Sequence, residues 1–441
     1  MMRSRWWGNG VLLLVILLVM PFLSGAPLQA QQQPLVLRVL DEGPVGNPWA
    51  KAASEYERFT NGRVRVEWIS SPWPGIQTRL ATTFAAGDTS IDITKTWGGW
   101  TNEFWPFFHA IDERWPARQR ATLLTYALHP VAAAGHIYGV PRHVTLYYFY
   151  WNKKMFQEAG LDPTKPPQNY EQLVAMCTKL TRDRDGDGRI DQWGYAESMD
   201  VGSPMLNTFE RWLYRAGGDI LDSRGNPVFN DRRGLRALQA IYDLIYTHKC
   251  IDPSALQLGN PATRQVFNAG RVAMMSMWGS GWAEAQDPTR ATKDVIGNVG
   301  VTILPALDLA IVRSATIHGS EGYAITKAAA QRGVVEEAWK LLQYMTSSAV
   351  QVEALRTRGY MPTSLTLYAD PDLTRDASLA PLMAATAEAG RYPVKRFVWS
   401  EYPRLEDAIE SELQAALRGR KPLQAALDSA AASVARILKG P

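Results

Sequence analysis

The sequence contains few of the residues that most often carry metal or thiol chemistry. It has two cysteines and six histidines in 441 residues, and no two histidines stand at the spacing of a zinc site. A strong charge of one sign is also missing: the formal net charge is +4, and no Lys/Arg block alternates with aromatic residues. Because a nucleic-acid surface needs such a basic stripe, the composition argues against nucleic acid as a partner.

Motifs of the common hydrolases and nucleotide-binding enzymes are absent as well. The sequence has no HExxH, no GxSxG, no P-loop and no GxGxxG after a strand. A glycosidase needs only two carboxylates, and with 43 acidic residues a secreted carbohydrate-active enzyme remains an alternative. No pair of carboxylates stands out, so we expect a protein that is not an enzyme.

Long apolar runs are confined to the N-terminus. Arg3 and Arg5 precede an apolar run over residues 11–20, which is typical of a secretory signal peptide. A membrane anchor is the alternative, but the run is about half of the roughly 20 residues that span a bilayer. We therefore predict a signal peptide over residues 1–30 and a periplasmic location, with cleavage after Ala30 and a competing site after Ala26 as the alternative. No cysteine follows the cleavage site, which argues against a lipid anchor.

Export would place the two cysteines in an oxidising compartment. Two such residues, Cys177 and Cys250, often pair there. Two separate buried thiols are the alternative, because the sequence does not show whether the Cα atoms lie within bridging distance.

The N-terminal part of the mature chain alternates strands with helices. Strands are predicted at LVLRVL (35–40), at the alternating apolar residues of 64–68 and at SIDIT (90–94). Helices are predicted from the Asn47–Pro48 pair to Gly62 and over residues 76–84. This order predicts an α/β fold with a parallel sheet, in which the carboxyl ends of the strands form a ligand crevice. The loop TWGGW (96–100) follows the third strand.

An ordered series of motifs begins near residue 135. The motifs are YGVP (138–141), NKKMF (152–156), AGL (159–161), AGGDILDSRGNPVFND (216–231), FNAGRVAMMSMWGSGW (267–282), VGVTILP (299–305), GYAITK (322–327), EEAWKLLQYMTS (336–347) and GYMP (359–362). In this order they resemble the family 1 extracellular solute-binding proteins of ABC importers, which include maltose-binding-protein-like sugar binders. The resemblance runs from about residue 35 to near the end of the chain.

The resemblance implies the two-lobe periplasmic binding protein fold, with hinge crossovers between the lobes and a ligand enclosed between them. On the family pattern, the N-terminal lobe holds residues 34–143 and 300–347, and the C-terminal lobe holds 146–297 and 350–439. The implied function is the substrate-binding component of an ABC transporter, with a permease as partner and a sugar or oligosaccharide as ligand. Sixteen tryptophans suit a ligand with apolar faces and hydroxylated edges. We expect a monomer.

Five tryptophans are candidate ligand-binding residues on the family pattern. Trp97 and Trp100 would form a platform on the first lobe, Trp278 and Trp282 its counterpart on the second, and Trp399 would reach the cleft ahead of the C-terminal helix. The alternative for each is a tryptophan of the core.

Four polar residues are further candidates. Arg142 and His143 lie at the expected lobe crossover, where an arginine either makes a hinge contact or binds a carboxylate or phosphate. A charged polyol, sugar acid or sugar phosphate is therefore the alternative ligand. Carboxylates at Glu42 and Glu321 would suit a hydroxyl-rich or cationic ligand.

The stretch DRDGDGRIDQWGY (183–195) begins like an EF-hand calcium loop. Asp183, Asp185, Asp187, Arg189 (through its carbonyl) and Asp191 occupy positions 1, 3, 5, 7 and 9, but Gly194 stands where the bidentate glutamate belongs. Residues 190–195 resemble a strand, so a calcium sensor with a second helix is not expected. We predict a structural Ca²⁺ completed by a carboxylate from elsewhere, for which Glu197 is the nearest candidate. An empty Asp-Gly turn is the alternative.

Overall fold

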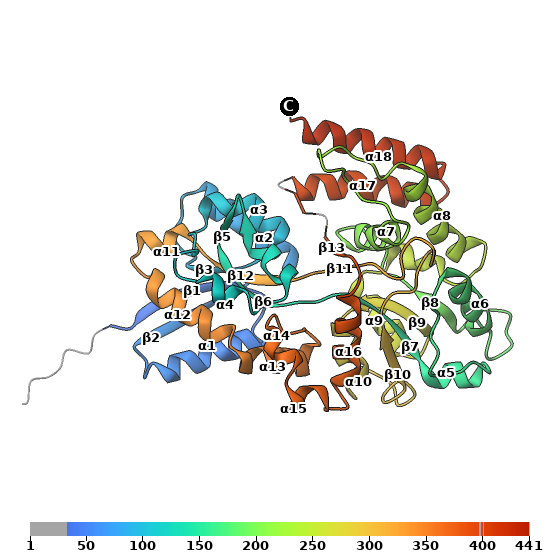
Figure 1. Cartoon of the computed structure of the whole chain (residues 1–441), viewed down its shortest axis with the longest axis horizontal. Helices are drawn as coiled ribbons and strands as arrows, with labels where there is room; N and C mark the ends of the chain where they lie inside the picture. Colours follow the sequence, from blue (N-terminus) through green and yellow to red (C-terminus); the bar gives the residue numbers. More distant parts are fainter. Residues whose placement is uncertain (1–32, 397, 400, 441) are drawn as a thin grey trace, which may run out of the picture.

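The computed structural model describes residues 33–396, 398–399 and 401–440, which form two lobes joined by extended crossovers (Figure 1). The predicted signal peptide and its cleavage site lie outside these residues. No helix among the described residues is both long and apolar enough to cross a bilayer.

The first lobe is built on a five-stranded sheet. Its strands lie in the order β2 (Val64–Ser70), β1 (Leu35–Asp41), β3 (Ile93–Trp97), β12 (Glu321–Ile325) and β6 (Gly139–His143). β1 pairs in parallel with β2 and β3, whereas β12 is antiparallel to both β3 and β6. The predicted parallel start is therefore confirmed. The third strand begins three residues later than predicted, so Trp97 ends a strand instead of lying in a loop.

Helices cover both faces of this sheet. α1 (Pro48–Phe59) and α12 (Val335–Met345) pack on the face that carries Leu37 and Val39, and α2 (Trp73–Ala85) and α3 (Gly98–Phe104) contribute to the core on the face that carries Leu40. The predicted start of α1 is confirmed, because the Asn47 side chain accepts hydrogen bonds from the N–H groups of Trp49 and Ala50.

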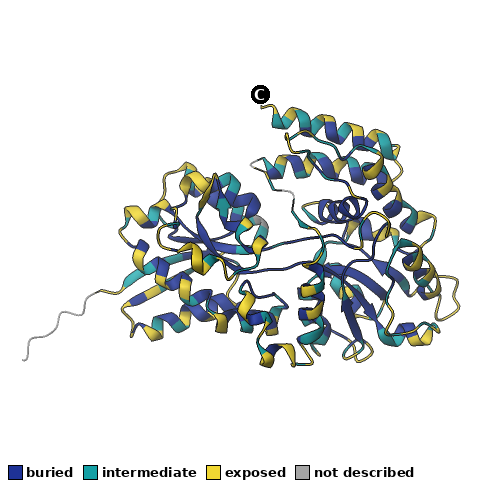
Figure 2. Ribbon diagram, in the orientation of Figure 1, coloured by how far each residue is buried: buried dark blue, intermediate teal, exposed yellow. Residues whose placement is uncertain are grey.

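The second lobe is built on a four-stranded sheet in the order β10 (Val299–Thr302), β7 (Tyr147–Asn152), β9 (Val272–Trp278) and β8 (Trp193–Ala196). Side chains of β7 alternate between two cores. One core contains α7 (Pro204–Arg215), α8 (Arg232–Tyr246), α17 (Tyr402–Leu417) and α18 (Leu423–Leu438). The other contains α9 (Asn260–Asn268), α10 (Ser280–Gln286) and α16 (Ala380–Ala389). Every residue of α7 is buried (Figure 2).

The remaining elements complete the two lobes. The helices are α4 (Ala117–Arg120), α5 (Lys153–Glu158), α6 (Tyr170–Leu180), α11 (Lys327–Gln331), α13 (Ser348–Arg358), α14 (Leu365–Tyr368) and α15 (Pro371–Thr374). The 3₁₀ turns are η1 (Trp105–Phe107), η2 (Thr125–Val131) and η3 (Pro253–Gln257), and the two-residue strands are β4 (Ala132–Ala133), β5 (His136–Ile137), β11 (Thr316–Ile317) and β13 (Val394–Lys395).

The return crossover lies later in the chain than the predicted boundary at 297–300. β10 pairs with β7 in the second sheet, and β11 pairs with β13 of the second lobe. Residues 300–317 therefore belong to the second lobe, and the chain returns to the first between Ile317 and Glu321. The apolar stretch VGVTILP is compatible with either sheet, and only the strand pairing decides. The outgoing crossover falls between His143 and Tyr147, as predicted.

The two cysteines form a disulfide. Cys177, on α6, is bonded to Cys250, and the two Cα atoms are 5.6 Å apart. Both side chains are buried. The sequence left open a disulfide or two separate buried thiols, and the structure contains the disulfide.

Candidate functional site

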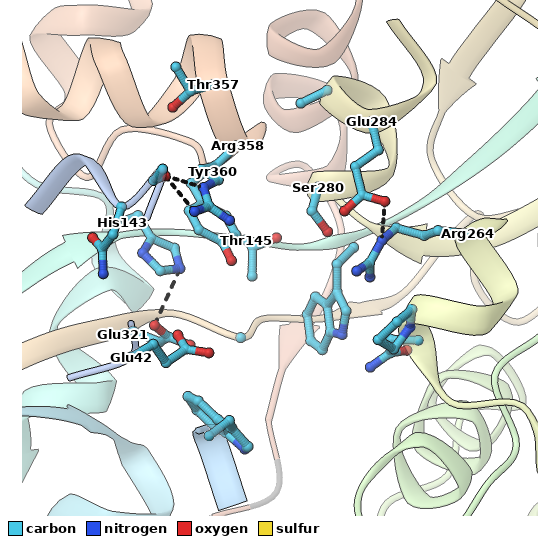
Figure 3. A pocket seen from close by; sticks show the side chains of 18 of the residues that line it. Glu42, His143, Thr145, Arg264, Ser280, Glu284, Glu321, Thr357, Arg358 and Tyr360 are labelled. Carbon is cyan, nitrogen blue, oxygen red and sulfur yellow. Dashed lines mark hydrogen bonds and ion pairs between the residues drawn. The ribbon is translucent and has the colours of Figure 1, made fainter. Parts of the chain in front are cut away.

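A cavity of about 1130 Å³ lies between the two lobes. The first lobe contributes Glu42, Trp73, Trp97, His143 and Glu321, and the second contributes Asn207, Asn260, Arg264, Trp278, Ser280, Glu284 and Arg396. Tyr360 also lines the cavity; it follows α13, which adds Val350 and Ala354 to the first-lobe core, so the predicted second-lobe boundary at residue 350 is too early. The labelled side chains from the two sides face each other across the open space in Figure 3. A cleft between lobes is a common location of a small-molecule site.

Glu42 and Glu321 form the acidic part of the first-lobe wall. Glu42 follows β1 and Glu321 begins β12, and the two lie side by side in Figure 3. Behind them, Nζ of Lys95 on β3 lies 2.6 Å from Oε2 of Glu42 and 3.1 Å from Oε2 of Glu321. Both predicted carboxylates line the cavity, where their remaining lone pairs are available to hydroxyl or ammonium donors.

Arg142 does not line the cavity, contrary to the expectation that its guanidinium faces a ligand. Its Nη1 lies 2.7 Å from Oδ2 of Asp41, and its Nη2 pairs with Glu321. The guanidinium also stacks 3.9 Å from the ring centroid of Trp49. Burial alone would raise the pKa of Asp41, but the charges of Arg142 and Lys95 outweigh it and hold the pKa below its ordinary value. Arg142 thus makes the hinge contact that was the alternative interpretation.

His143 lines the cavity as a neutral imidazole. Its ring stacks on Tyr360 with centroids 4.0 Å apart and planes 8° apart. Burial, and then the charges of Arg142 and Lys95, lower the pKa of His143 well below its ordinary value. Neither ring nitrogen has a hydrogen-bond partner among the described residues, although Nε2 lies 3.9 Å from Oε2 of Glu321. A neutral imidazole can both donate to and accept from a hydroxyl group.

Of the two first-lobe tryptophans that were predicted, one lines the cavity. Trp97 does so, and its ring also contacts Tyr402 of α17 in the second lobe, with centroids 4.9 Å apart. Trp100 is buried behind the wall, 4.6 Å from the ring of Trp73. Trp73 lines the cavity and is only partly buried. Trp73, which begins α2, was not predicted, because the first-lobe tryptophans were sought only in the loop after the third strand.

Of the three tryptophans predicted in the second lobe, only Trp278 lines the cavity. Trp282 points into the core under α16, and its indole N–H donates to the carbonyl of Ser378 over 2.6 Å. Trp282 lies in the first turn of α10, which directs its ring inward, so the placement differs from the predicted stacking position. Trp399 is 39% exposed and lies beside Gly225, outside the cavity lining.

The chain matches the model of the bacterial extracellular solute-binding protein family over residues 41–352. It belongs to that family. A probable amino-acid ABC transporter periplasmic-binding protein of Sinorhizobium fredii is 22% identical over 83% of this chain and 81% of its own length. An arabinooligosaccharide-binding protein of Halalkalibacterium halodurans is 27% identical over 56% of this chain and 52% of its own length. The maltose-bound MalE3 of T. maritima has the same fold, with a TM-score of 0.80, 24% identity and coverage of 91% of this chain and 100% of that one.

The two crossovers of this solute-binding protein pair with each other, and Gly319 contacts Trp278 of the second lobe. Leu146 and His318 form an antiparallel bridge, and the N–H of Gly319 donates to the carbonyl of Thr145 over 2.8 Å. A Cβ at Gly319 would lie 2.9 Å from Cη2 of Trp278. Glycine is therefore needed at this position for the indole to rest on the crossover, where it faces the cavity.

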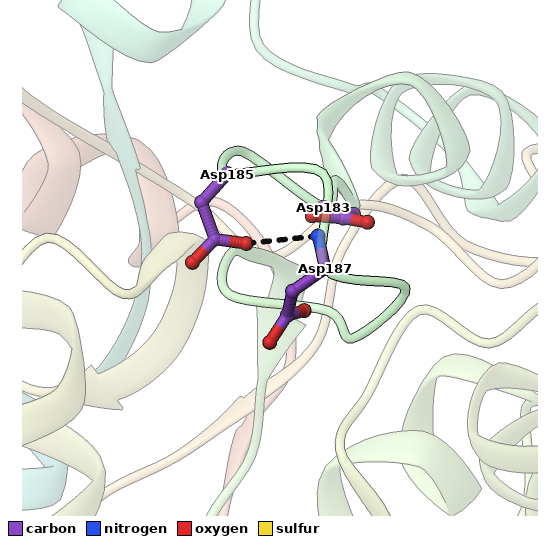
Figure 4. Close-up of side chains that lie close together, drawn as sticks. All are labelled: Asp183, Asp185 and Asp187. Atoms are coloured by element: carbon purple, nitrogen blue, oxygen red, sulfur yellow. Dashed lines mark hydrogen bonds between the residues drawn. The ribbon is translucent and has the colours of Figure 1, made fainter.

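The Asp-rich loop of this solute-binding protein gathers three of its carboxylates. Oxygens of Asp183, Asp185 and Asp187 lie within 4.8 Å of one another on the surface (Figure 4). The carboxylate of Asp183 also accepts hydrogen bonds from the N–H groups of Gly186 and Gly188.

The other residues of the loop differ in their surroundings. Asp191 accepts from the N–H of Arg184, and the N–H of Arg189 donates to Asp187. Glu197 is buried in a pair with Arg211, so it is not the completing carboxylate. β8 (Trp193–Ala196) follows the loop as predicted. Calcium binding by the loop stays a prediction.

Proposed function

We propose that this chain is the periplasmic substrate-binding component of an ABC importer and that it captures a neutral sugar or oligosaccharide between its lobes. The observation that carries this proposal is the pairing of two partly buried tryptophans from opposite lobes, Trp73 and Trp278, in one cavity. Indole rings suit the apolar faces of pyranose rings. The names of the arabinooligosaccharide-binding relative and of the maltose-bound structure support the same ligand class.

The charges of the cavity favour a neutral ligand. Among the described residues, six carboxylates and five cationic side chains line it, so neither sign dominates. Arg142, which suggested a phosphate or carboxylate ligand, already pairs with Asp41 and Glu321. A charged polyol, sugar acid or sugar phosphate is therefore the weaker candidate. The name of the Sinorhizobium relative would suggest an amino acid as ligand, but the cavity is much larger than a free amino acid.

Capture would proceed by closure of the hinge. A ligand that contacts both walls binds the closed arrangement better than the open one and shifts the population towards it. We expect a membrane permease to recognise the closed form, the chain to act as a monomer, and the ligand to leave unchanged rather than to be hydrolysed.

Native mass spectrometry of the mature protein, purified from its own host without refolding, tests the proposal. We expect an added mass that matches one or more hexose or pentose units, bound without hydrolysis. A retained compound with a phosphate or carboxylate would replace the neutral-sugar proposal with the charged alternative. Release of a shortened sugar during incubation would contradict binding without turnover.

A further inference from the structure

Lys95 is a buried lysine directly behind the first-lobe wall. It lies on β3, and only 1% of its side chain is exposed. Its ammonium contacts three residues: Glu42 and Glu321 by ion pairs, and Trp73 with Nζ 4.1 Å from the ring centroid. All three line the cavity, whereas Lys95 does not.

The charges around Lys95 come from three other strands and the chain after β1. Asp41 ends β1 and Glu42 follows it, Glu321 begins β12, and Arg142 and His143 end β6. Arg142 is directed at Asp41 and Glu321, and His143 is neutral because burial and the neighbouring cations lower its pKa. Lys95 is therefore the cation that pairs with Glu42 among the described residues. Without it, three carboxylates would face one guanidinium.

We propose that Lys95 is a positioning residue that determines which ligands this wall accepts. Its ammonium holds Glu42 and Glu321 as a pair of hydrogen-bond acceptors beside the indole of Trp73, and the two carboxylates cover its charge on the cavity side. The wall then accepts hydroxyl or ammonium donors and rejects phosphorylated compounds. The ligand part of this inference rests on the proposed function, whereas the pairing of the carboxylates does not.

The pairing is tested without any ligand, on the mature protein. In Lys95→Met, the carboxylates of Glu42 and Glu321 keep their places without the ammonium that pairs with both, so protonation of one of them relieves their repulsion in the folded chain. Since such a group binds more protons folded than unfolded, stability falls as the pH rises. We expect Tm to drop more between pH 5 and pH 8 in Lys95→Met than in the wild type. Lys340→Met removes an exposed lysine of α12 and should keep the wild-type profile.

A double variant separates this role from simple loss of packing. Lys95→Met with Glu42→Gln removes one of the repelling charges, so its Tm profile should return to that of the wild type. If the single variant does not fold, recovery of folding in the double variant supports the same role, and failure of both overturns it. A Lys95→Met profile that matches Lys340→Met, or a double variant that keeps the steeper slope, would overturn the proposal.

Ligand selection is tested by calorimetry with maltotriose and with sn-glycerol 3-phosphate. We expect the wild type to bind maltotriose and not the phosphate, and Lys95→Met to bind maltotriose about tenfold or more weakly at pH 8, with partial recovery at pH 5. Preferred binding of the phosphate by the wild type would overturn the selection. If neither compound binds, maltotriose is not a ligand of this protein, and the Tm profiles alone decide the role of Lys95.

Discussion

Nη1 of Arg142 lies 2.7 Å from Oδ2 of Asp41, and both side chains are fully buried near the carboxyl ends of β6 and β1. Removing one partner of a buried ion pair leaves the other uncompensated. Arg142→Met should therefore lower the free energy of unfolding by about 3–5 kcal/mol, measured by urea denaturation. Arg65→Met, at an exposed position of β2, is the control and should change it by less than about 0.5 kcal/mol. Unchanged stability with weakened ligand binding would show that Arg142 contacts the ligand instead.

The tryptophans should separate into binding and packing residues. Trp73→Ala and Trp278→Ala should each weaken binding of the native ligand by about 2 kcal/mol or more, because both rings line the cavity. Trp282→Ala should instead lower the free energy of unfolding by about 3–5 kcal/mol, because its ring fills the core. Calorimetry and urea denaturation of all three variants check this. If Trp282→Ala were as stable as the wild type but deficient in binding, our assignment would be wrong.

Glu410 should make stability depend on pH. Its carboxylate accepts hydrogen bonds from the N–H groups of Gly202, Ser203 and Leu206, at the start of α7. Burial, and then the nearby Glu406, raise its pKa to about 7. Between the ordinary glutamate pKa and about 7, the folded chain binds more protons than the unfolded chain, so Glu410 lowers stability as the pH rises through this window.

Glu410→Gln should remove that contribution, which is on the order of 2 kcal/mol. Urea denaturation at several pH values between 4.5 and 7.5 measures it. Glu412→Gln, on the same helix and paired with Lys421, should keep the wild-type slope. An unchanged slope in Glu410→Gln would show that another group is responsible.

The Cys177–Cys250 bridge should contribute strongly to stability. It closes a loop with a sequence separation of 73 residues, and cross-linking a loop of this length restricts the unfolded chain by about 4 kcal/mol. A Cys177→Ala/Cys250→Ala variant should lose about that much free energy of unfolding, and reducing agent should destabilise the wild type but not the variant. Equal stability with and without reductant would contradict the prediction.

Calcium should stabilise the mature protein if the Asp-rich loop binds it. At a calcium concentration roughly ten times Kd, the gain is about 1.4 kcal/mol, visible as a higher Tm that EGTA reverses. Asp185→Asn/Asp187→Asn should abolish the response, because two of the three clustered carboxylates are neutralised. Asp191→Asn tests whether the fourth carboxylate takes part. A Tm that calcium does not change would leave an Asp-Gly turn without a metal role.

The sequence predicted helices and strands best where hydrophobic periodicity and helix-capping residues occur together. Local patterns predicted the first strands after the signal peptide, the helix start at Asn47 and β8. The start of a strand or a helix depends mainly on neighbouring residues, so such patterns are sufficient there. Glu42, Trp97 and His143 were predicted near the cavity because the ends of strands and the crossovers converge there, whereas Trp278 and Glu321 were predicted from the family resemblance.

Tertiary structure decided what local patterns do not contain. Trp278 and Trp282 stand four residues apart, yet the first rests on Gly319 beside the cavity and the second fills a core. The side on which each ring lies depends on how β9 and α10 pack, which no local motif encodes. The same holds for VGVTILP, whose sheet is decided by pairing with β7. Lys95 and Arg142 are further cases, since their partners are brought together only by folding. The sequence by itself thus determined the family, the elements and the region of the site, and the fold decided which side chains face the ligand, because long-range packing sets side-chain direction.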